Sequence, residues 1–355
     1  MSAYFSEKYK TLTPYTPGEQ PKDTQYVKLN TNESPYPPAP TVLDAITQEE
    51  ISKLRLYSDP TNQSLKQKLA DLYGLKPDNI FLGNGSDEIL SFAFMAFADS
   101  KGVAYPDISY GFYSVYAALY GAGAQEIPLT QNYSVNYQDY CGIGKMCVLA
   151  NPNAPTGKSI PVWQIEEILK SNPGCVVVID EAYVDFGGES CYPLLDSYEN
   201  LLVVRTFSKS RCMAGARLGY AFGSPALIED LEKIKFSTNP FNVDRLAQVL
   251  GEATVEANDY YMEKCREIIA TRTETGKALQ KMGFEVLESQ TNFLFAKSPA
   301  ISGFDLYLEL KKRGILVRHF AKPRTEAFVR ITIGTPEQMQ VFLAAVKDIL
   351  KGESL

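Results

Sequence analysis

Hydrophobic and polar positions follow a regular alternation through the first two thirds of the chain. Continuous apolar runs, such as KMCVLA at 145–150 and CVVVID at 175–180, are typical of strands buried on both faces of a parallel sheet. The segment at 86–99 is apolar with an acidic first turn, and VWQIEEILK lies between the two runs, so both predict helices. This rhythm predicts an α/β sheet with helices on both faces.

The rhythm changes after about residue 235. A mostly helical stretch covers about 243–282, and short apolar segments and two further helices follow it, which indicates a smaller α+β unit. The first 40 residues are rich in Pro, Thr, Tyr and Asn and predict an extended arm. We therefore expect an N-terminal arm at 1–40, a large domain at 41–240 and a small C-terminal domain at 241–355.

Composition restricts the function classes. The 355 residues are 45% hydrophobic and carry a net charge of −7, which argues against disorder and against general binding to nucleic acid or anionic membranes. The single histidine, His319, excludes multi-histidine zinc sites, and we expect no metal. Six scattered cysteines without C-x-x-C spacing, and an N-terminus without an apolar signal segment, predict reduced thiols and a cytoplasmic location.

Four polar segments follow predicted strands. TFSKSRCMAGARLGY at 206–220 combines hydroxyls, Lys209 and Arg217 with small residues, which suits a phosphate beside a reactive amine. NPNAPTG at 151–157 predicts a rigid turn at a strand's carboxyl end, where open α/β sheets bind ligands. Asp180 ends an apolar strand, as a helix cap or a partner for a cationic ring nitrogen. GNGSDE at 83–88 opens a helix whose first N–H groups suit an anion.

Together these segments resemble, in the same order, the fold-type I pyridoxal-phosphate (PLP) aminotransferases of class II, and in particular the histidinol-phosphate aminotransferases. The resemblance covers nearly the whole chain and includes LNTNESPYPP, SYGFYSV, TNFLF, GILVRHF and VRITIGT. It implies a large PLP-binding domain with a mostly parallel central sheet flanked by helices, and a smaller α+β C-terminal domain. It also implies PLP as cofactor and a homodimer with shared active sites.

The resemblance assigns roles residue by residue. Lys209 matches the Schiff-base lysine, Asp180 the carboxylate on the pyridinium nitrogen, and Tyr183 the hydroxyl beside the ring's phenolic oxygen. The other matches to cofactor ligands are the stacked ring Tyr110, the phosphate ligands Ser86, Asp87, Thr206, Ser208 and Arg217, and Tyr57 from the partner subunit. The matches on the substrate side are Arg330, Arg318, Asn292 and, in the arm, Tyr15.

One turn departs from the family pattern, N-P-N-N-P-T-G. This chain has Ala154 where the family asparagine hydrogen-bonds the cofactor's phenolic oxygen. Either Asn153 takes over that contact, or Tyr183 acts alone. A lost hydrogen bond of about 0.5–1.5 kcal/mol need not abolish activity.

The implied reaction is transamination of L-histidinol phosphate with 2-oxoglutarate, which yields imidazole-acetol phosphate and glutamate in histidine biosynthesis. The implied kinetic order is ping-pong, through Lys209. An aromatic or broad-range amino-acid aminotransferase and a threonine-phosphate decarboxylase remain alternatives. Tyr113, Tyr116 and Tyr120 do not decide between them, because their helical spacing is typical of core positions. A non-catalytic protein of the same fold has no need for this set of residues.

Overall fold

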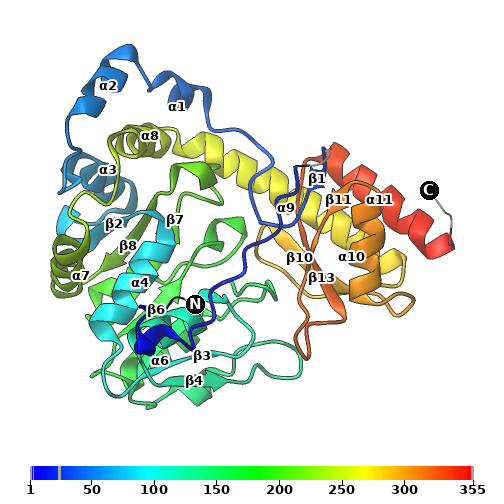
Figure 1. Ribbon diagram of the computed structural model, residues 1–355, viewed down its shortest axis with the longest axis horizontal. Helices are drawn as coiled ribbons and strands as arrows, with labels where there is room; N and C mark the ends of the chain where they lie inside the picture. The colour runs from blue at the N-terminus through cyan, green and yellow to red at the C-terminus, as the bar shows by residue number, and fades with distance from the viewer. Residues whose placement is uncertain (1, 3, 23–24, 353–355) are drawn as a thin grey trace.

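The computed structural model describes residues 2, 4–22 and 25–352. A seven-stranded sheet lies at the centre of its larger part (Figure 1). Its strand order is β2-β8-β7-β6-β5-β3-β4. β8 runs antiparallel to both neighbours and the other pairs are parallel, which confirms the mostly parallel sheet. The strands are β2 (Ile80–Gly83), β3 (Val103–Pro106), β4 (Ala124–Ile127), β5 (Met146–Ala150), β6 (Val177–Asp180), β7 (Leu201–Thr206) and β8 (Gly219–Gly223).

Helices cover both faces of this sheet, as the sequence predicts. Neighbouring strand residues point to opposite faces, so Val178 packs into one apolar cluster and Ile179 into the other. The Val178 face is covered by α4 (Gly85–Phe97), α5 (Phe112–Tyr120) and α7 (Pro225–Thr238). The Ile179 face is covered by α3 (Gln63–Tyr73), α6 (Val162–Ser171) and α8 (Arg245–Glu256).

The C-terminal part has its own antiparallel sheet, in the order β12-β13-β10-β9, and its own apolar cluster. The strands are β9 (Glu285–Val286), β10 (Phe293–Lys297), β12 (Arg318–His319) and β13 (Phe328–Thr332). Helices α10 (Gly303–Lys312) and α11 (Pro336–Lys351) pack against it, and the long α9 (Asn258–Lys281) runs from the large sheet to this smaller one (Figure 1). The expected combination of a parallel large unit and a smaller α+β unit is confirmed.

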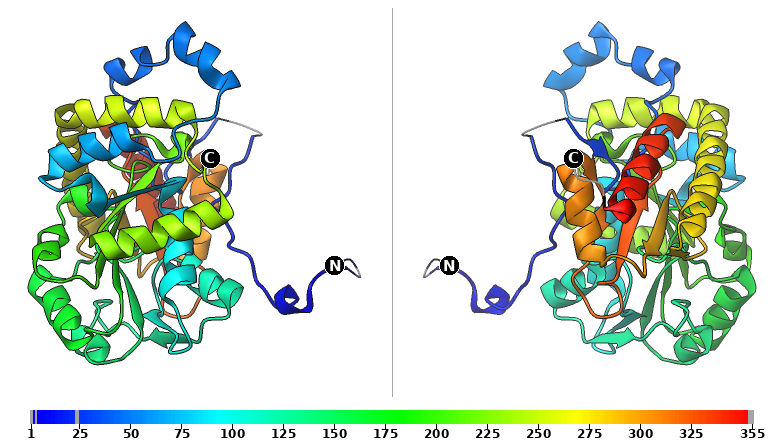
Figure 2. Two further views of the ribbon diagram at one scale, coloured as in Figure 1. Left: turned by 90° about the vertical axis from the view of Figure 1, so that its left-hand side faces the viewer. Right: turned by 90° about the vertical axis from the view of Figure 1, so that its right-hand side faces the viewer.

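The two halves of the N-terminal arm differ in how they contact the rest of the molecule. Its first described turn, η1 (Glu7–Tyr9), projects from the body of the molecule (Figure 2). Further along, β1 (Val27–Lys28) pairs in parallel with β11 (Ile315–Leu316) beside the small sheet. Asn30 and Asn32 are each 1% exposed, so this half of the arm is part of the folded interior.

Short elements complete the description. The segment after the arm contains α1 (Pro40–Asp44), α2 (Gln48–Ser52) and η2 (Lys53–Arg55), and it stands at the edge of the molecule (Figure 1). The remaining 3-10 turns are η3 (Pro77–Asn79), η4 (Tyr137–Tyr140), η5 (Val184–Phe186), η6 (Tyr192–Asp196) and η7 (Ala214–Ala216). Within the described residues, none of the helices combines the length and the apolar character that a bilayer crossing requires.

Candidate functional site

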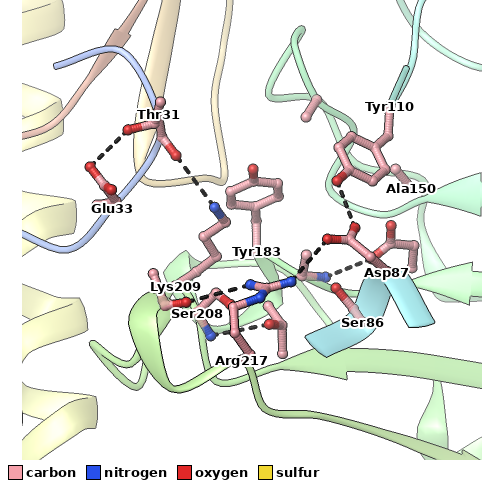
Figure 3. A pocket seen from close by; sticks show the side chains of 15 residues that line it. Thr31, Glu33, Ser86, Asp87, Tyr110, Ala150, Tyr183, Ser208, Lys209 and Arg217 are labelled. Atoms are coloured by element: carbon pink, nitrogen blue, oxygen red, sulfur yellow. Dashed lines mark hydrogen bonds and ion pairs between the residues drawn. The ribbon is translucent and has the colours of Figure 1, made fainter. Parts of the chain in front are cut away.

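A cavity of about 260 Å³ opens at the carboxyl ends of the central strands. The last residues of β5, β6 and β7, which are Ala150, Asp180 and Thr206, all line it. Parallel strands end at the same edge of a sheet, so three distant segments meet there. Nine residues that the sequence singled out line this cavity: Ser86, Asp87, Tyr110, Asp180, Tyr183, Thr206, Ser208, Lys209 and Arg217 (Figure 3).

Lys209 lies in the loop after β7 with its amine in the cavity (Figure 3). Its Nζ lies 3.4 Å from the carbonyl oxygen of Thr31 and 5.8 Å from the centre of the Tyr183 ring. Among the described residues, no carboxylate forms an ion pair with this amine. A lysine held by one long hydrogen bond and a ring face is free to react with a carbonyl group.

Asp180 lies at the end of β6, deep in the cavity. Its carboxylate accepts hydrogen bonds from Tyr113 Oη at 2.8 Å and from the Ala182 N–H at 3.2 Å. Burial raises the pKa of Asp180 to about 6, although these two hydrogen bonds oppose the rise. A carboxylate so poorly solvated gains from a cationic partner, and a protonated pyridine nitrogen is such a partner.

Another group of cavity residues suits an anion. Ser86 and Asp87 lie in the first turn of α4, where free N–H groups and the helix dipole favour negative charge. Arg217 Nη2 lies 3.1 Å from Asp87 Oδ2. A Cβ atom at Gly85, where φ is +77°, would lie 2.6 Å from Arg217 Nη2, so glycine permits this close approach. With the Thr206 and Ser208 hydroxyls, these groups form a cradle for a phosphate.

The cavity therefore fits PLP by the chemistry of its donor set. The carboxylate, the amine and the phosphate cradle match the ring nitrogen, the aldehyde carbon and the phosphate of this cofactor. Tyr110 also lines the cavity and is held by a hydrogen bond from its Oη to Asp87 Oδ1 at 2.7 Å.

Two arginines lie together on the small sheet. Arg318 of β12 is directly opposite Arg330 of β13. Arg318 donates to the carbonyl oxygens of Thr16 and Pro17 in the arm, both at 3.1 Å. The Arg330 guanidinium lies near the Phe293 and Phe320 rings, and among the described residues no carboxylate pairs with it.

Tyr15 connects this arginine pair to the cavity. Its ring lies 6.0 Å from the Tyr110 ring and stacks on Phe112 at 4.3 Å between centroids. Burial raises the pKa of Tyr15, and the charges of Arg330 and Arg318 oppose the rise, which indicates that both arginines lie close to its hydroxyl. The arm thus brings an aromatic side chain close to both arginines.

Besides Arg330, Arg318 and Tyr15, three further predicted site residues lie outside the cavity lining. Asn153 uses its amide within the turn, with hydrogen bonds to Ile108, Ser109 and Thr156, and Ala154 lines the cavity in its stead. Asn292 is fully buried and donates to the carbonyl oxygen of Asn32. Tyr57 is 79% exposed and stacks on Phe241, away from the cavity of its own chain.

Four consecutive arm residues, 30–33, contact the site although they were not predicted from the sequence. Asn30 accepts from Arg330, Thr31 accepts from Lys209, and Asn32 donates to Tyr183. Glu33 lines the cavity. The available signal was the polar run NTNES between Leu29 and the proline-rich segment, which is unusual for a buried stretch.

Tyr113 was also missed, because its helical spacing indicates a core residue. It is a core residue, fully buried on α5, and its hydroxyl is bonded to Asp180. Nothing in the local pattern distinguishes this tyrosine from Tyr116, whose hydroxyl bonds the backbone of Asp87 instead.

Comparisons with known proteins agree with this geometry. The family model "Aminotransferase class I and II" matches residues 24–346. Histidinol-phosphate aminotransferases of Brachyspira hyodysenteriae and Marinomonas sp. are 46% and 49% identical, over 99% and 98% of this chain and all of theirs.

A solved structure extends the comparison to the fold. The histidinol-phosphate aminotransferase of Sinorhizobium meliloti, in complex with pyridoxal-5'-phosphate, matches with a TM-score of 0.88 at 23% identity, covering 100% of this chain and 99% of that one. The predicted fold-type I architecture is confirmed. From the full-length match and the sequence identity, the chain belongs to the class I and II aminotransferases and, within them, to the histidinol-phosphate aminotransferase family.

Proposed function

We propose that the protein transfers the amino group of L-histidinol phosphate to 2-oxoglutarate in histidine biosynthesis, with PLP bound at Lys209. The observation that carries the proposal is one cavity that holds a lysine amine without a described carboxylate partner, a buried carboxylate and a phosphate cradle. The full-length relatives, which are histidinol-phosphate aminotransferases, support the choice of substrate. The Sinorhizobium meliloti structure contains the same cofactor.

Each group in the cavity has a distinct task in this proposal. Asp180 holds the proton on the cofactor's ring nitrogen, and Arg217, with the first turn of α4, binds its phosphate. Tyr183 donates its hydroxyl to the phenolic oxygen. When bound, PLP supplies an electron sink for the electron pair left on the substrate's α-carbon. Lys209 Nζ takes the proton from that carbon, since no described carboxylate holds the amine by an ion pair.

The arginine pair accounts for two different substrates in one site. Histidinol phosphate carries a phosphate, and glutamate carries a second carboxylate. A guanidinium binds either anion through paired N–H groups, and Arg330 has no described carboxylate partner that would compete. Tyr15 and Arg318 complete this side of the site from the arm and from β12.

A homodimer is part of the proposal. Large apolar side chains are exposed from α1 to η2 and on the neighbouring loop near Phe241, and such a patch marks a protein interface. Tyr57 stacks on Phe241 in this patch, so it is available to a partner's phosphate cradle and not to its own. We also propose a cytoplasmic location, which the six free cysteines support.

The test compares four amino donors. Glutamate formation from 2-oxoglutarate is measured with histidinol phosphate, phenylalanine, tyrosine and threonine phosphate, and release of carbon dioxide is followed in parallel. We expect histidinol phosphate to be the best donor. Faster turnover of phenylalanine would assign a broad-range aminotransferase, and carbon dioxide from threonine phosphate without 2-oxoglutarate would assign a decarboxylase. Lys209→Ala should remove all turnover, whereas the exposed Lys101→Ala should keep it.

A further inference from the structure

We propose that Asn32 is a positioning residue, whose side-chain amide fixes the direction in which Tyr183 donates its hydroxyl proton. This inference rests on the proposed function, because the acceptor of that proton is the phenolic oxygen of PLP. Asn32 lies in the arm, 151 positions before Tyr183, and its Nδ2 lies 2.9 Å from Tyr183 Oη. Ala154, in the turn beside the cavity, offers no polar side chain for this purpose.

Burial and two backbone hydrogen bonds fix the position of Asn32. It is 1% exposed, and its backbone has φ of 57°, a left-handed conformation that asparagine tolerates better than most residues. Its N–H donates to Thr332 Oγ1 at 3.0 Å, and its carbonyl oxygen accepts from Asn292 Nδ2 at 2.9 Å. Both partners belong to the small sheet region and are almost completely buried, so the position of Asn32 is set by β13 and by the residue before β10.

The hydrogen bonds of Thr332 support one orientation of the Asn32 amide. Thr332 Oγ1 accepts from the Asn32 backbone N–H, and its own single proton is donated to Asn32 Oδ1 at 3.0 Å. The oxygen of the amide therefore faces Thr332. The NH₂ group faces Tyr183 and donates to its Oη. In this orientation Thr332 Oγ1 accepts from the backbone N–H and donates to the amide oxygen, so both of its hydrogen bonds are satisfied.

The tyrosine therefore keeps its own proton for the cavity. Tyr183 Oη accepts from Asn32, and no other hydrogen bond of this hydroxyl is present among the described residues. Tyr183 lines the cavity beside Lys209. A hydroxyl that accepts one hydrogen bond donates its own proton more strongly, because the two bonds polarise each other. Asn32 thus directs Tyr183 to stabilise negative charge on an oxygen placed near Lys209.

The pH dependence of the visible absorbance of the PLP-loaded protein tests this. The midpoint of this titration is the pH at which half of the Lys209-linked nitrogen has lost its proton. If the ionised phenolic oxygen is stabilised less, that nitrogen keeps its proton to higher pH, and the midpoint rises. We expect Asn32→Gly, in which glycine keeps the left-handed backbone, to raise the midpoint by about half a pH unit. Thr332→Val, which frees the amide to turn, should shift it less and in the same direction.

Two comparisons separate positioning through Tyr183 from a general disturbance of the arm. Asn30→Ala changes a neighbouring buried asparagine whose amide bonds the Glu19 carbonyl oxygen and not Tyr183, and it should leave the midpoint unchanged. In a Tyr183→Phe background, Asn32→Gly should cause no further shift. An unchanged midpoint in Asn32→Gly, or an equal shift with and without Tyr183, overturns the proposal.

The outcome also distinguishes this inference from the proposed function. Both proposals would be overturned if the wild-type protein showed no visible PLP band, or if Lys209→Ala did not remove that band. A wild-type protein with that band, whose midpoint Asn32→Gly does not move, would overturn the role of Asn32 alone.

Discussion

Arg330→Met tests the proposed role of Arg330 in substrate binding separately from its effect on stability. The change keeps an unbranched apolar side chain and removes a guanidinium that makes one described hydrogen bond, to the Asn30 carbonyl oxygen at 3.1 Å. Its loss costs about 1.5–3 kcal/mol, and loss of the cationic contacts with two rings costs about 1–2 kcal/mol. Against this, the Nε is buried without an acceptor, and burial lowers the pKa of Arg330. Desolvation of an unpaired charge costs several kcal/mol.

The balance predicts a variant that is more stable and less active. We expect the free energy of unfolding of the cofactor-free protein, measured in urea, to rise by about 1 kcal/mol. We expect kcat/KM for histidinol phosphate to fall about 100-fold, because a charged contact to the substrate's anion is lost. Arg272→Met is the matched control. Arg272 is buried outside the cavity and donates to the carbonyl oxygens of Phe186 and Thr291 at 2.9 and 2.6 Å.

Burial also lowers the pKa of Arg272, to about 10, so its removal relieves the same kind of desolvation. Because two carbonyl acceptors are left unpaired instead of one, we expect Arg272→Met to be less stable than Arg330→Met. An Arg330→Met protein that is destabilised as much as Arg272→Met would show that Arg330 is a structural residue. Unchanged kcat/KM would refute its role in binding the anion.

Asp180, Tyr57 and Glu19 give three further predictions. The pKa of Asp180 in the folded protein, about 6, exceeds its ordinary 3.8, so the folded state binds this proton more tightly than the unfolded chain. The cofactor-free protein therefore loses about 3 kcal/mol of its free energy of unfolding as pH rises from 3.8 through 6. Urea unfolding of Asp180→Asn should lack that decline, and equal pH profiles would contradict the burial. Mixing Tyr57→Ala with Lys209→Ala subunits should restore activity above either parent, since hybrid dimers regain one intact site; no gain would mean that Tyr57 acts within its own chain. Glu19 accepts hydrogen bonds from Tyr307 and Lys311 and so holds the arm beside Arg318. Glu19→Gln should therefore raise KM for histidinol phosphate. An unchanged KM would mean that the arm does not form part of the binding site.

The residues that could be predicted from the sequence are those at the ends of buried strands. The apolar run before Asp180 and the polar loop around Lys209 are local patterns, and the parallel sheet brings their ends together without further information. The residues that meet in the cavity could therefore be predicted from short segments and from the resemblance that they carry.

The contributions of Asn32 and Tyr113 could not be read in this way. Asn32 reaches Tyr183 because β1 pairs with β11 and because Thr332 and Asn292 hold it, and these partners lie 260 to 300 positions away. Tyr113 has the spacing of a core helix residue, and its bond to Asp180 depends on how α5 packs on the sheet. Long-range register and packing are not encoded in a local pattern.

The pairing of β1 with β11 has a consequence for the order of events during synthesis. The strands join residues 27–28 to residues 315–316, so the arm has no partner strand until most of the chain has left the ribosome. The seven strands of the large sheet, all between residues 80 and 223, can assemble earlier. A nascent chain that ends before β11 thus exposes the Lys209 loop without Thr31 and Asn32 above it. A chain truncated before β11 therefore lacks the strand pairing that holds Thr31 beside Lys209.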